Sequence, residues 1–204
     1  HDDDHDHAHG DDHAHDDHAH DDGHGHDHAH AHDGVDPHAW LDPVNAQVWL
    51  GAIASALSEA DPGNAALYAR NAEEGRAELD ALIEEIEGDL APLEGRDFVV
   101  FHDAYHYFED RFGIEAAGAI AVSDAAPPSP ARVAEIRAAI EGMDAACVFA
   151  EPQFEPDLVD TVTEGTGART GVLDPVGVAL EPGPALYPSL LRNLAKSLVG
   201  CLAD

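Results

Sequence analysis

Four short apolar segments, separated by helical patterns, constrain the fold of this chain most strongly. The segments cover residues 98–101, 114–120, 147–150 and 169–173. Helical patterns alternate with them over residues 103–112, 130–143, 156–164 and 187–201. Strands joined by helical crossovers form parallel sheets with right-handed connections. The pattern therefore predicts an α/β domain, and ligands of such domains bind beyond the carboxyl ends of the strands.

Two helices are expected upstream of this domain. The first begins at Asp42-Pro43, because Asp is a favoured N-cap and Pro suits the first helical position. Its apolar residues at helical spacing are Trp49, Ile53, Ala56, Leu57 and Ala60. The second runs from about Asn64 to Ala91, roughly 42 Å at the usual rise per residue. Gly75 weakens that helix by about 1 kcal/mol and allows a bend there.

Residues 1–34 have a composition unlike the rest of the chain. They contain thirteen His and twelve Asp, interleaved with Ala and Gly, and DDHAH occurs twice in tandem at 11–20. Such a segment buries too little apolar surface to offset its ordering entropy, so we expect disorder without ligand. A purification tag would be a compact His run, which this is not. We hypothesise that the segment binds or buffers metal ions; the alternatives are that it only senses their abundance or has no essential role.

The formal net charge of -33 restricts the partners. A field of this sign repels nucleic acid and anionic membranes and attracts cations, so no nucleic-acid partner is expected. No run of eighteen apolar residues is present to span a bilayer. The chain starts inside low-complexity sequence with no initiator Met and no signal peptide. We interpret it as a mature fragment or a protein without its upstream part.

Three side chains outside the first segment are candidate metal ligands. His102 directly follows the strand FVVF, His38 lies in the loop VDPHAWLDP, and Asp174 follows the fourth strand in GVLDPVG. Two imidazoles and a carboxylate are suitable ligands for tetrahedral zinc. Each residue also has a simpler interpretation: a satisfied core histidine, a loop histidine packed on Trp40, or a turn-capping aspartate. Spacing leaves both interpretations open.

Cys147 and Cys201 are the only cysteines. Cys147 lies in a predicted core strand and Cys201 on the apolar face of the last helix. From position alone they are either two buried free thiols or a disulfide.

Four motifs, in order along the chain, resemble one family. They are DPHAWLDP, FVVFHDAYHYFEDRFG, CVFAEPQFEP and GVLDPVG. They are similar to the zinc-binding periplasmic solute-binding proteins of bacterial ABC transporters, the ZnuA-type cluster A-I group. The resemblance extends over residues 1–204.

The resemblance implies two parallel-sheet α/β lobes joined by a long rigid helix, with metal in the cleft between them. By this reading residues 35–63 end the N-terminal lobe, 64–92 form the linking helix and 93–204 form a complete C-terminal lobe. Residues 1–34 would be the disordered His/Asp-rich loop. The N-terminal lobe of the family begins further upstream and supplies another His ligand, so most of that lobe is expected to be missing here.

The resemblance also assigns site residues. His38 and His102 match family ligands, and Asp174 matches an acidic position at the metal. His102 favours zinc over manganese, because manganese-type relatives carry a carboxylate there and nitrogen is the softer ligand. Glu151, at the end of the third predicted strand, is expected at most to support the ligands without touching the metal.

Auxiliary ligands and a disulfide complete the expected set. His106 stands one helical turn from His102 and is an auxiliary candidate. Further auxiliary candidates in the first segment are His24, His26, His28, His30 and His32. A disulfide between Cys147 and Cys201 is implied by the resemblance, and it requires an oxidising compartment.

The implied function is high-affinity capture of zinc in the periplasm and its delivery to an ABC transporter permease. Zinc is then the cargo, no reaction is catalysed, and a monomer is expected. Two alternatives stay open within transport and storage: a manganese-type solute-binding protein, and a zinc buffer or metallochaperone acting through the His-rich segment. A metalloenzyme is disfavoured, because no Glu directly follows His102 and no second HD cluster appears outside residues 1–34.

Overall fold

The computed structural model describes residues 35–121, 129–143, 145–154 and 157–203. The predictions made for residues 1–34, including the five auxiliary histidines there, lie outside this range.

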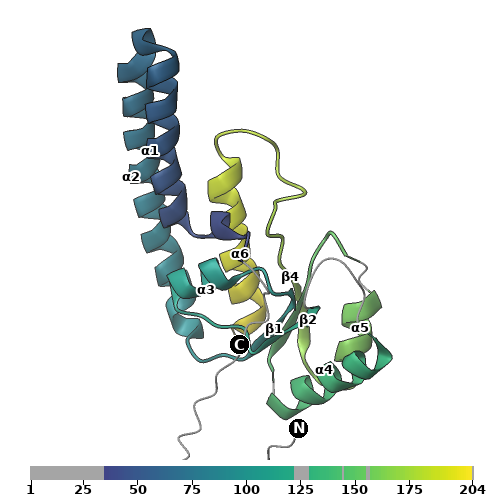
Figure 1. Ribbon diagram of the computed structural model, residues 1–204. Coiled ribbons are helices and arrows are strands. Elements are labelled where there is room, and N and C mark those ends of the chain that lie inside the picture. Colours follow the sequence, from purple (N-terminus) through teal and green to yellow (C-terminus); the bar gives the residue numbers. More distant parts are fainter. Residues whose placement is uncertain (1–34, 122–128, 144, 155–156, 204) are drawn as a thin grey trace, which may run out of the picture. The chain divides into compact units, whose positions relative to one another are not determined.

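Two antiparallel helices, α1 and α2, open the described part of the chain (Figure 1). α1 spans Pro43–Ala60; Asp42 caps it by accepting a hydrogen bond from the Val44 N–H at 2.8 Å. α2 spans Ala65–Leu90 without interruption at Gly75. A Cβ at that glycine would lie 3.0 Å from Leu50 Cδ1, so the glycine serves close packing of the two helices instead of a bend.

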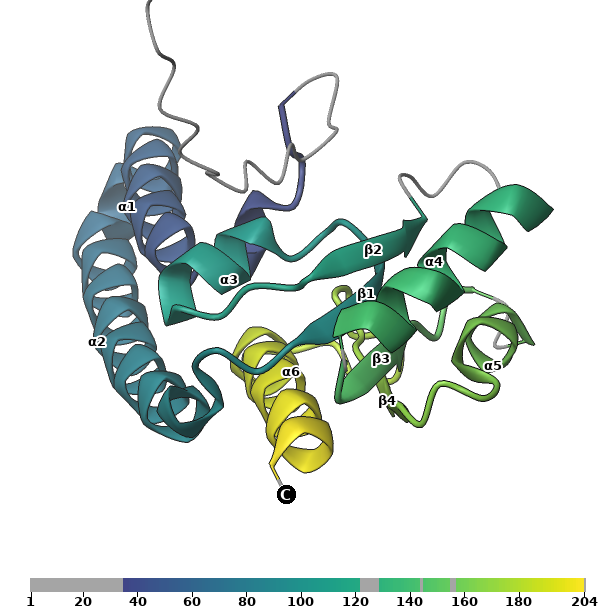
Figure 2. The same cartoon turned by 90° about the horizontal axis from the view of Figure 1, so that it is seen from below.

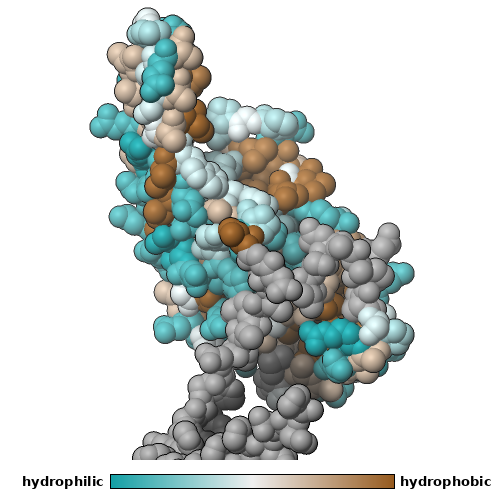
Figure 3. Space-filling view, in the orientation of Figure 1, coloured by the Kyte–Doolittle hydropathy of each residue, from teal (hydrophilic) through white to brown (hydrophobic). Residues whose placement is uncertain are grey.

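The apolar face of α1 is not buried as its spacing suggests. Val48, Trp49, Ile53 and Leu57 are each more than 40% exposed. Figure 3 shows hydrophobic side chains at the surface of this hairpin and of the loop that precedes α6. Within the described residues, nothing covers that side of α1.

Four parallel strands form the sheet, as the sequence predicts. They are β1 (Phe98–His102), β2 (Gly118–Ala121), β3 (Cys147–Ala150) and β4 (Arg169–Val172), in the spatial order β2-β1-β3-β4. The register pairs Val99 with Gly118, Phe98 with Cys147, and Cys147 with Arg169. All four strands therefore end at the same edge, where His102 is the last residue of β1.

Helices cover both faces of the sheet (Figure 2). α4 (Pro130–Met143) and α5 (Asp157–Thr163) pack on one face, and α3 (His106–Phe112) and α6 (Leu186–Leu202) lie on the other together with α2. The two faces have separate cores because alternate strand residues point to opposite sides: Phe98 and Val100 belong to one, Val99 and Phe101 to the other. None of the described helices is long and apolar enough to cross a membrane.

Two predicted boundaries are wrong near the candidate site. The helix expected from residue 103 begins at His106, because the Ala104 N–H bonds to the His102 carbonyl in a tight turn. The second strand begins at Gly118 and not at residue 114. The predicted start of α4 is confirmed, since Ser129 Oγ accepts the Arg132 N–H and Pro130 is the first helical residue.

A disulfide joins Cys147 of β3 to Cys201 of α6, as the resemblance implies. Their Cα atoms lie 6.1 Å apart, and 54 residues separate them in sequence. The bridge fastens the last helix to the centre of the sheet.

Candidate metal centre

His102 and Glu151 meet at the carboxyl edge of the sheet. His102 ends β1, and Glu151 directly follows β3, the neighbouring strand. His102 Nδ1 lies 2.6 Å from Glu151 Oε1, and the two residues are 6% and 3% exposed. Because a carboxylate only accepts, Nδ1 carries the hydrogen, and in the neutral ring Nε2 then has the lone pair. This is the tautomer that can bind a metal through Nε2.

His38 has the same arrangement on a different segment. Asp36 Oδ1 accepts hydrogen bonds from the His38 backbone N–H at 2.9 Å and from Nδ1 at 2.7 Å. His38 Nε2 is thereby left with its lone pair as well. The His38 and His102 rings lie with centroids 5.4 Å apart and planes inclined by 64°.

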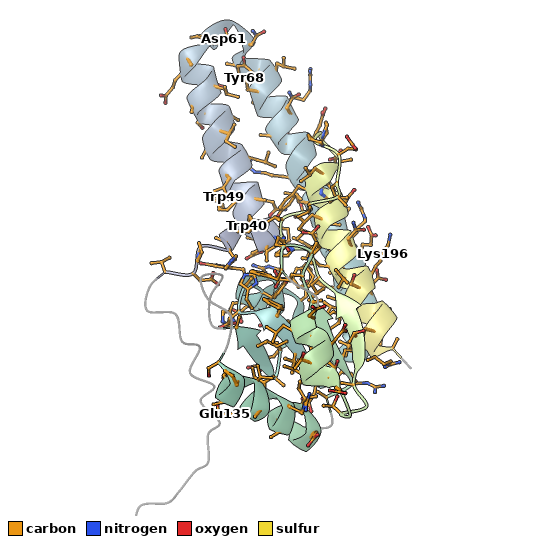
Figure 4. All side chains as sticks on the ribbon, turned by 90° about the vertical axis from the view of Figure 1, so that its right-hand side faces the viewer. Trp40, Trp49, Asp61, Tyr68, Glu135 and Lys196 are labelled. Atoms are coloured by element: carbon orange, nitrogen blue, oxygen red, sulfur yellow. A yellow bond between two sulfur atoms is a disulfide. The ribbon has the colours of Figure 1, made fainter. Side chains whose placement is uncertain are left out.

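Three contacts hold the His38 segment against the α/β domain. Trp40 Nε1 donates to the Pro175 carbonyl at 2.9 Å, and Tyr187 Oη donates to the Trp40 carbonyl at 2.7 Å. Arg111 of α3 forms a two-bond ion pair with Asp42. Figure 4 shows Trp40 at the base of the α1–α2 hairpin, where the chain enters α1. Tyr187 lies 147 positions after Trp40 in sequence, so a remote part of the chain helps to position the His38 segment.

Asp174 lies at the end of β4 and caps the loop that follows it. Its carboxylate accepts the backbone N–H groups of Val176, Gly177 and Val178, the last at 2.6 Å, and the Gln153 side-chain amide at 3.2 Å. These are the contacts of the turn-capping interpretation. Among the described residues, no three His, Cys, Asp or Glu side chains converge as a metal site. The structure thus brings the two predicted histidines together, and a metal-bound position of Asp174 stays a prediction.

His106 sits on the first turn of α3 beside two acids. Its Nε2 lies 3.1 Å from Asp103 Oδ1 and its Nδ1 lies 3.6 Å from Glu109 Oε2. Burial, opposed by a hydrogen bond from the Ala116 N–H and assisted by the charges of Asp103, Glu115 and Asp110, raises the pKa of Glu109 to about 8. An auxiliary metal role for His106 remains a prediction.

Tyr105 completes the wall behind His102. Burial, followed by the charge of Glu151, raises the pKa of the Tyr105 phenol well above its ordinary value, so the hydroxyl stays protonated. Phe154 packs edge-on against the His102 ring with centroids 5.6 Å apart. The His102 ring is therefore fixed on one side by aromatic packing and at Nδ1 by a carboxylate.

Sequence reasoning did not single out Asp36, Arg111 or Tyr105. Asp36 had a local signal, because the Asp-Pro-His spacing lets the carboxylate reach both the backbone and the ring of His38. Arg111 and Tyr105 had none, since their partners Asp42 and Glu151 are remote in sequence.

A parallel sheet, a long helix and paired histidines at the sheet edge are features of metal-binding solute-binding proteins. The chain belongs to the ZnuA family, because the family described as "Zinc-uptake complex component A periplasmic" matches residues 1–201. The members of that family are transport components that bind a solute.

Curated relatives agree with this assignment. The chain is 52% identical over 161 residues to the high-affinity zinc uptake system protein ZnuA of Brucella suis, which covers 79% of this chain and 48% of the relative. The ZnuA protein of Paracoccus denitrificans is 46% identical over 161 residues, covering 78% and 49%. The chain therefore spans about half the length of the curated relatives it matches.

Solved structures share the fold. A crystal structure titled ZnuA superposes with a TM-score of 0.72 at 28% identity, covering 83% of this chain and 61% of that one. The laminin-binding adhesin Lmb of Streptococcus agalactiae gives 0.72 at 29% identity, with 82% and 63% covered. These neighbours are two-lobed solute-binding proteins, of which this chain covers a part.

Proposed function

We propose that the protein captures zinc between His38 and His102 and delivers it to the permease of an ABC transporter. The observation that carries this proposal is the pairing of two imidazoles 5.4 Å apart, each with Nδ1 bonded to a carboxylate. A tetrahedral zinc with Zn–N bonds of about 2.0–2.1 Å holds two ring centroids roughly 5 Å apart. The rings are thus spaced for one shared ion.

Zinc is the preferred cargo in this proposal. Both described nitrogen ligands are imidazoles, which suit zinc better than manganese. The relatives from Brucella and Paracoccus are named as high-affinity zinc uptake proteins. Delivery to a membrane permease and a periplasmic location follow for this chain by kinship with them, and we expect it to act as a monomer.

Asp174 is proposed as a third ligand. Its two oxygens already accept backbone N–H groups, but each carboxylate oxygen has two lone-pair directions. One oxygen can therefore keep its turn contact and also meet a cation. The adjoining Pro175 carbonyl holds Trp40, so this loop and the His38 segment are already in contact.

We propose that residues 35–63 complete a first lobe, that 64–92 link it to a second, and that 93–204 form the second. The exposed apolar side of α1 supports this division, because such a surface is normally covered. The 161 matched residues make up 48% of the Brucella suis relative, so about half of that relative lies outside the match, which is enough for another lobe.

Residues 1–34 are proposed to concentrate zinc near the site. Neutral imidazoles interleaved with carboxylates form many weak, exchanging chelates. Titrating zinc into the chain and into a variant without residues 1–33 tests this, and an unchanged stoichiometry would rule out binding by the segment.

Competition against a zinc chelator tests the main proposal. A chelator strips weakly held zinc, so the readout reports the tight site. We expect His38→Ala and His102→Ala each to weaken zinc binding at least 100-fold. Tyr68→Phe, at the far tip of the α1–α2 hairpin (Figure 4), is the control and should bind like wild type. His106→Ala, measured in the same way, decides whether that residue assists.

Two results would contradict the proposal. One is a double His38→Ala, His102→Ala variant that competes for zinc as well as the wild type does. The other is displacement of zinc by equimolar manganese, which would favour the manganese-type alternative.

A further inference from the structure

Glu151 is the least exposed charged side chain among the described residues, with 3% of its surface accessible. It follows β3 at the edge where β1 ends in His102. One oxygen, Oε1, accepts the His102 Nδ1–H at 2.6 Å. The other, Oε2, is buried as well, and the buried Tyr105 hydroxyl lies close enough for the Glu151 carboxylate to raise the pKa of that phenol.

This arrangement is poorly suited to a purely stabilising role. A buried carboxylate is costly unless all its oxygens are satisfied, and buried ion pairs are often replaced by uncharged groups without loss of stability. Glu151 keeps its carboxyl group buried beside His102 and the Tyr105 phenol. The fold therefore retains a buried polar group that costs desolvation, which points to a use beyond packing.

A divalent cation bound at this site needs negative charge nearby, and Glu151 can provide part of it. His38 and His102 bind a cation as neutral ligands, so they cannot offset the charge of a divalent ion. The carboxylates of Asp36 and Glu151 stand directly behind them, each one hydrogen bond away. Together with Asp174, the proposed third ligand, they place negative charge around a divalent cation that two neutral imidazoles cannot supply. A carboxylate bonded to a ligating histidine also fixes the ring and raises its basicity.

We infer that Glu151 is a positioning and charge-balancing residue for the cation held by His102. It selects the tautomer whose hydrogen is on Nδ1 and lowers the cost of burying the ion. The inference rests on the proposed zinc site and adds to it a residue that does not touch the metal.

Three variants of the full chain separate orientation from charge. Glu151→Gln keeps an acceptor oxygen but removes the charge, whereas Glu151→Asp keeps the charge on a shorter side chain. Glu135→Gln, on the exposed side of α4, is the control for loss of one carboxylate. Zinc affinity is measured by chelator competition at pH 7.5, and urea unfolding is measured on the zinc-free proteins. Nitrogen NMR of the zinc-free proteins reports which His102 nitrogen carries the hydrogen.

Glu151→Gln should weaken zinc binding about 10- to 100-fold, the usual range for such partners. Its zinc-free unfolding should stay at or above wild-type stability. Glu151→Asp should lose less affinity than Glu151→Gln, and Glu135→Gln should lose none. The wild-type spectrum should show the hydrogen on Nδ1 of His102.

The failures are distinguishable. If wild type does not compete for zinc, the proposed function falls. If wild type competes and Glu151→Gln competes equally, only the role of Glu151 is overturned. An affinity loss matched by equal destabilisation of the zinc-free protein would reduce Glu151 to a structural residue. If Glu151→Gln does not fold, Glu151→Asp decides, and wild-type affinity together with a hydrogen on Nε2 would refute the inference.

Discussion

Arg111 and Asp42 form a two-bond ion pair that joins α3 to the start of α1. Arg111 Nε donates to Asp42 Oδ1 at 2.8 Å and Nη2 donates to Oδ2 at 2.9 Å. Asp42 also caps α1 by accepting the Val44 N–H. The same carboxylate thus serves the helix end and fixes the chain four residues after His38.

Removing this pair should destabilise the protein and loosen the site. Arg111→Met leaves Asp42, which is 13% exposed, without its cation, and should cost about 1–2 kcal/mol in the free energy of unfolding by urea. Arg192→Met breaks a similar fork to Glu85 between exposed side chains, where little stability is expected. Equal effects of the two substitutions would show that the Asp42 pair has no special role.

Gly171 is expected to be intolerant of any side chain. A Cβ there would lie 2.5 Å from the Phe149 ring, which is fully buried in the core. Gly171→Ala should therefore lower the free energy of unfolding by about 1–3 kcal/mol. Gly88→Ala is the matched control: its Cβ meets nothing within 4 Å inside α2, and the change should stabilise by about 0.5–1 kcal/mol. Urea unfolding of both variants checks the opposite signs, and a neutral Gly171→Ala would contradict the packing described.

The Cys147–Cys201 bridge should contribute about 4 kcal/mol, given its 54-residue separation and the loss of unfolded-state freedom. The double Cys→Ala variant and the reduced wild type should unfold at the same lower urea concentration, because both lack the same cross-link. Oxidised wild type is the reference. Coincident unfolding of the oxidised and reduced protein would contradict this expectation.

Glu109 should make the fold less stable as pH rises. Burial raises the pKa of its carboxyl to about 8 in the folded protein, from 4.5. Above pH 4.5 the unfolded chain releases this proton while the folded protein keeps it, so the stability present at low pH is lost up to pH 8. The loss is at most about 1.4 kcal/mol per pH unit within that window.

Glu109→Gln removes the titrating group and should flatten this part of the profile. Unfolding by urea at intervals from pH 5 to 9 gives the comparison. The groups facing Glu109 are His106, Asp103, Asp110 and Glu115, which are unchanged in both proteins. Parallel profiles for wild type and variant would show that Glu109 is not the source.

The sheet and the order of its elements could be predicted because their signals are local. Cys147–Ala150 is a short apolar run, and its predicted bounds match β3. Ser129-Pro130 marks the start of α4 by the chemistry of those two residues. The start of α3 was misplaced because the turn after His102 depends on one backbone hydrogen bond, from Ala104 to His102, that no side-chain pattern announces.

The types of residue in the candidate site could be predicted from the sequence, but which of them contact each other could not. His38 and His102 stand out at loop and strand ends, yet nothing local shows that they meet. The contact depends on the pairing of β1 with β3 and on Trp40 reaching Pro175, 135 positions away. The apolar spacing on α1 predicts the helix itself, but not that Trp49 and Ile53 are exposed among the described residues.

The contacts that hold the His38 segment affect how fast a bound cation could leave. β1 lies inside the sheet, so a cation shared by His38 and His102, as proposed, would be released when the short stretch around Trp40 moves away from the α/β domain. That movement breaks the hydrogen bonds made by Trp40, Tyr187 and Arg111 together. The time for which such a cation stays bound would then depend on these contacts as well as on the coordination bonds.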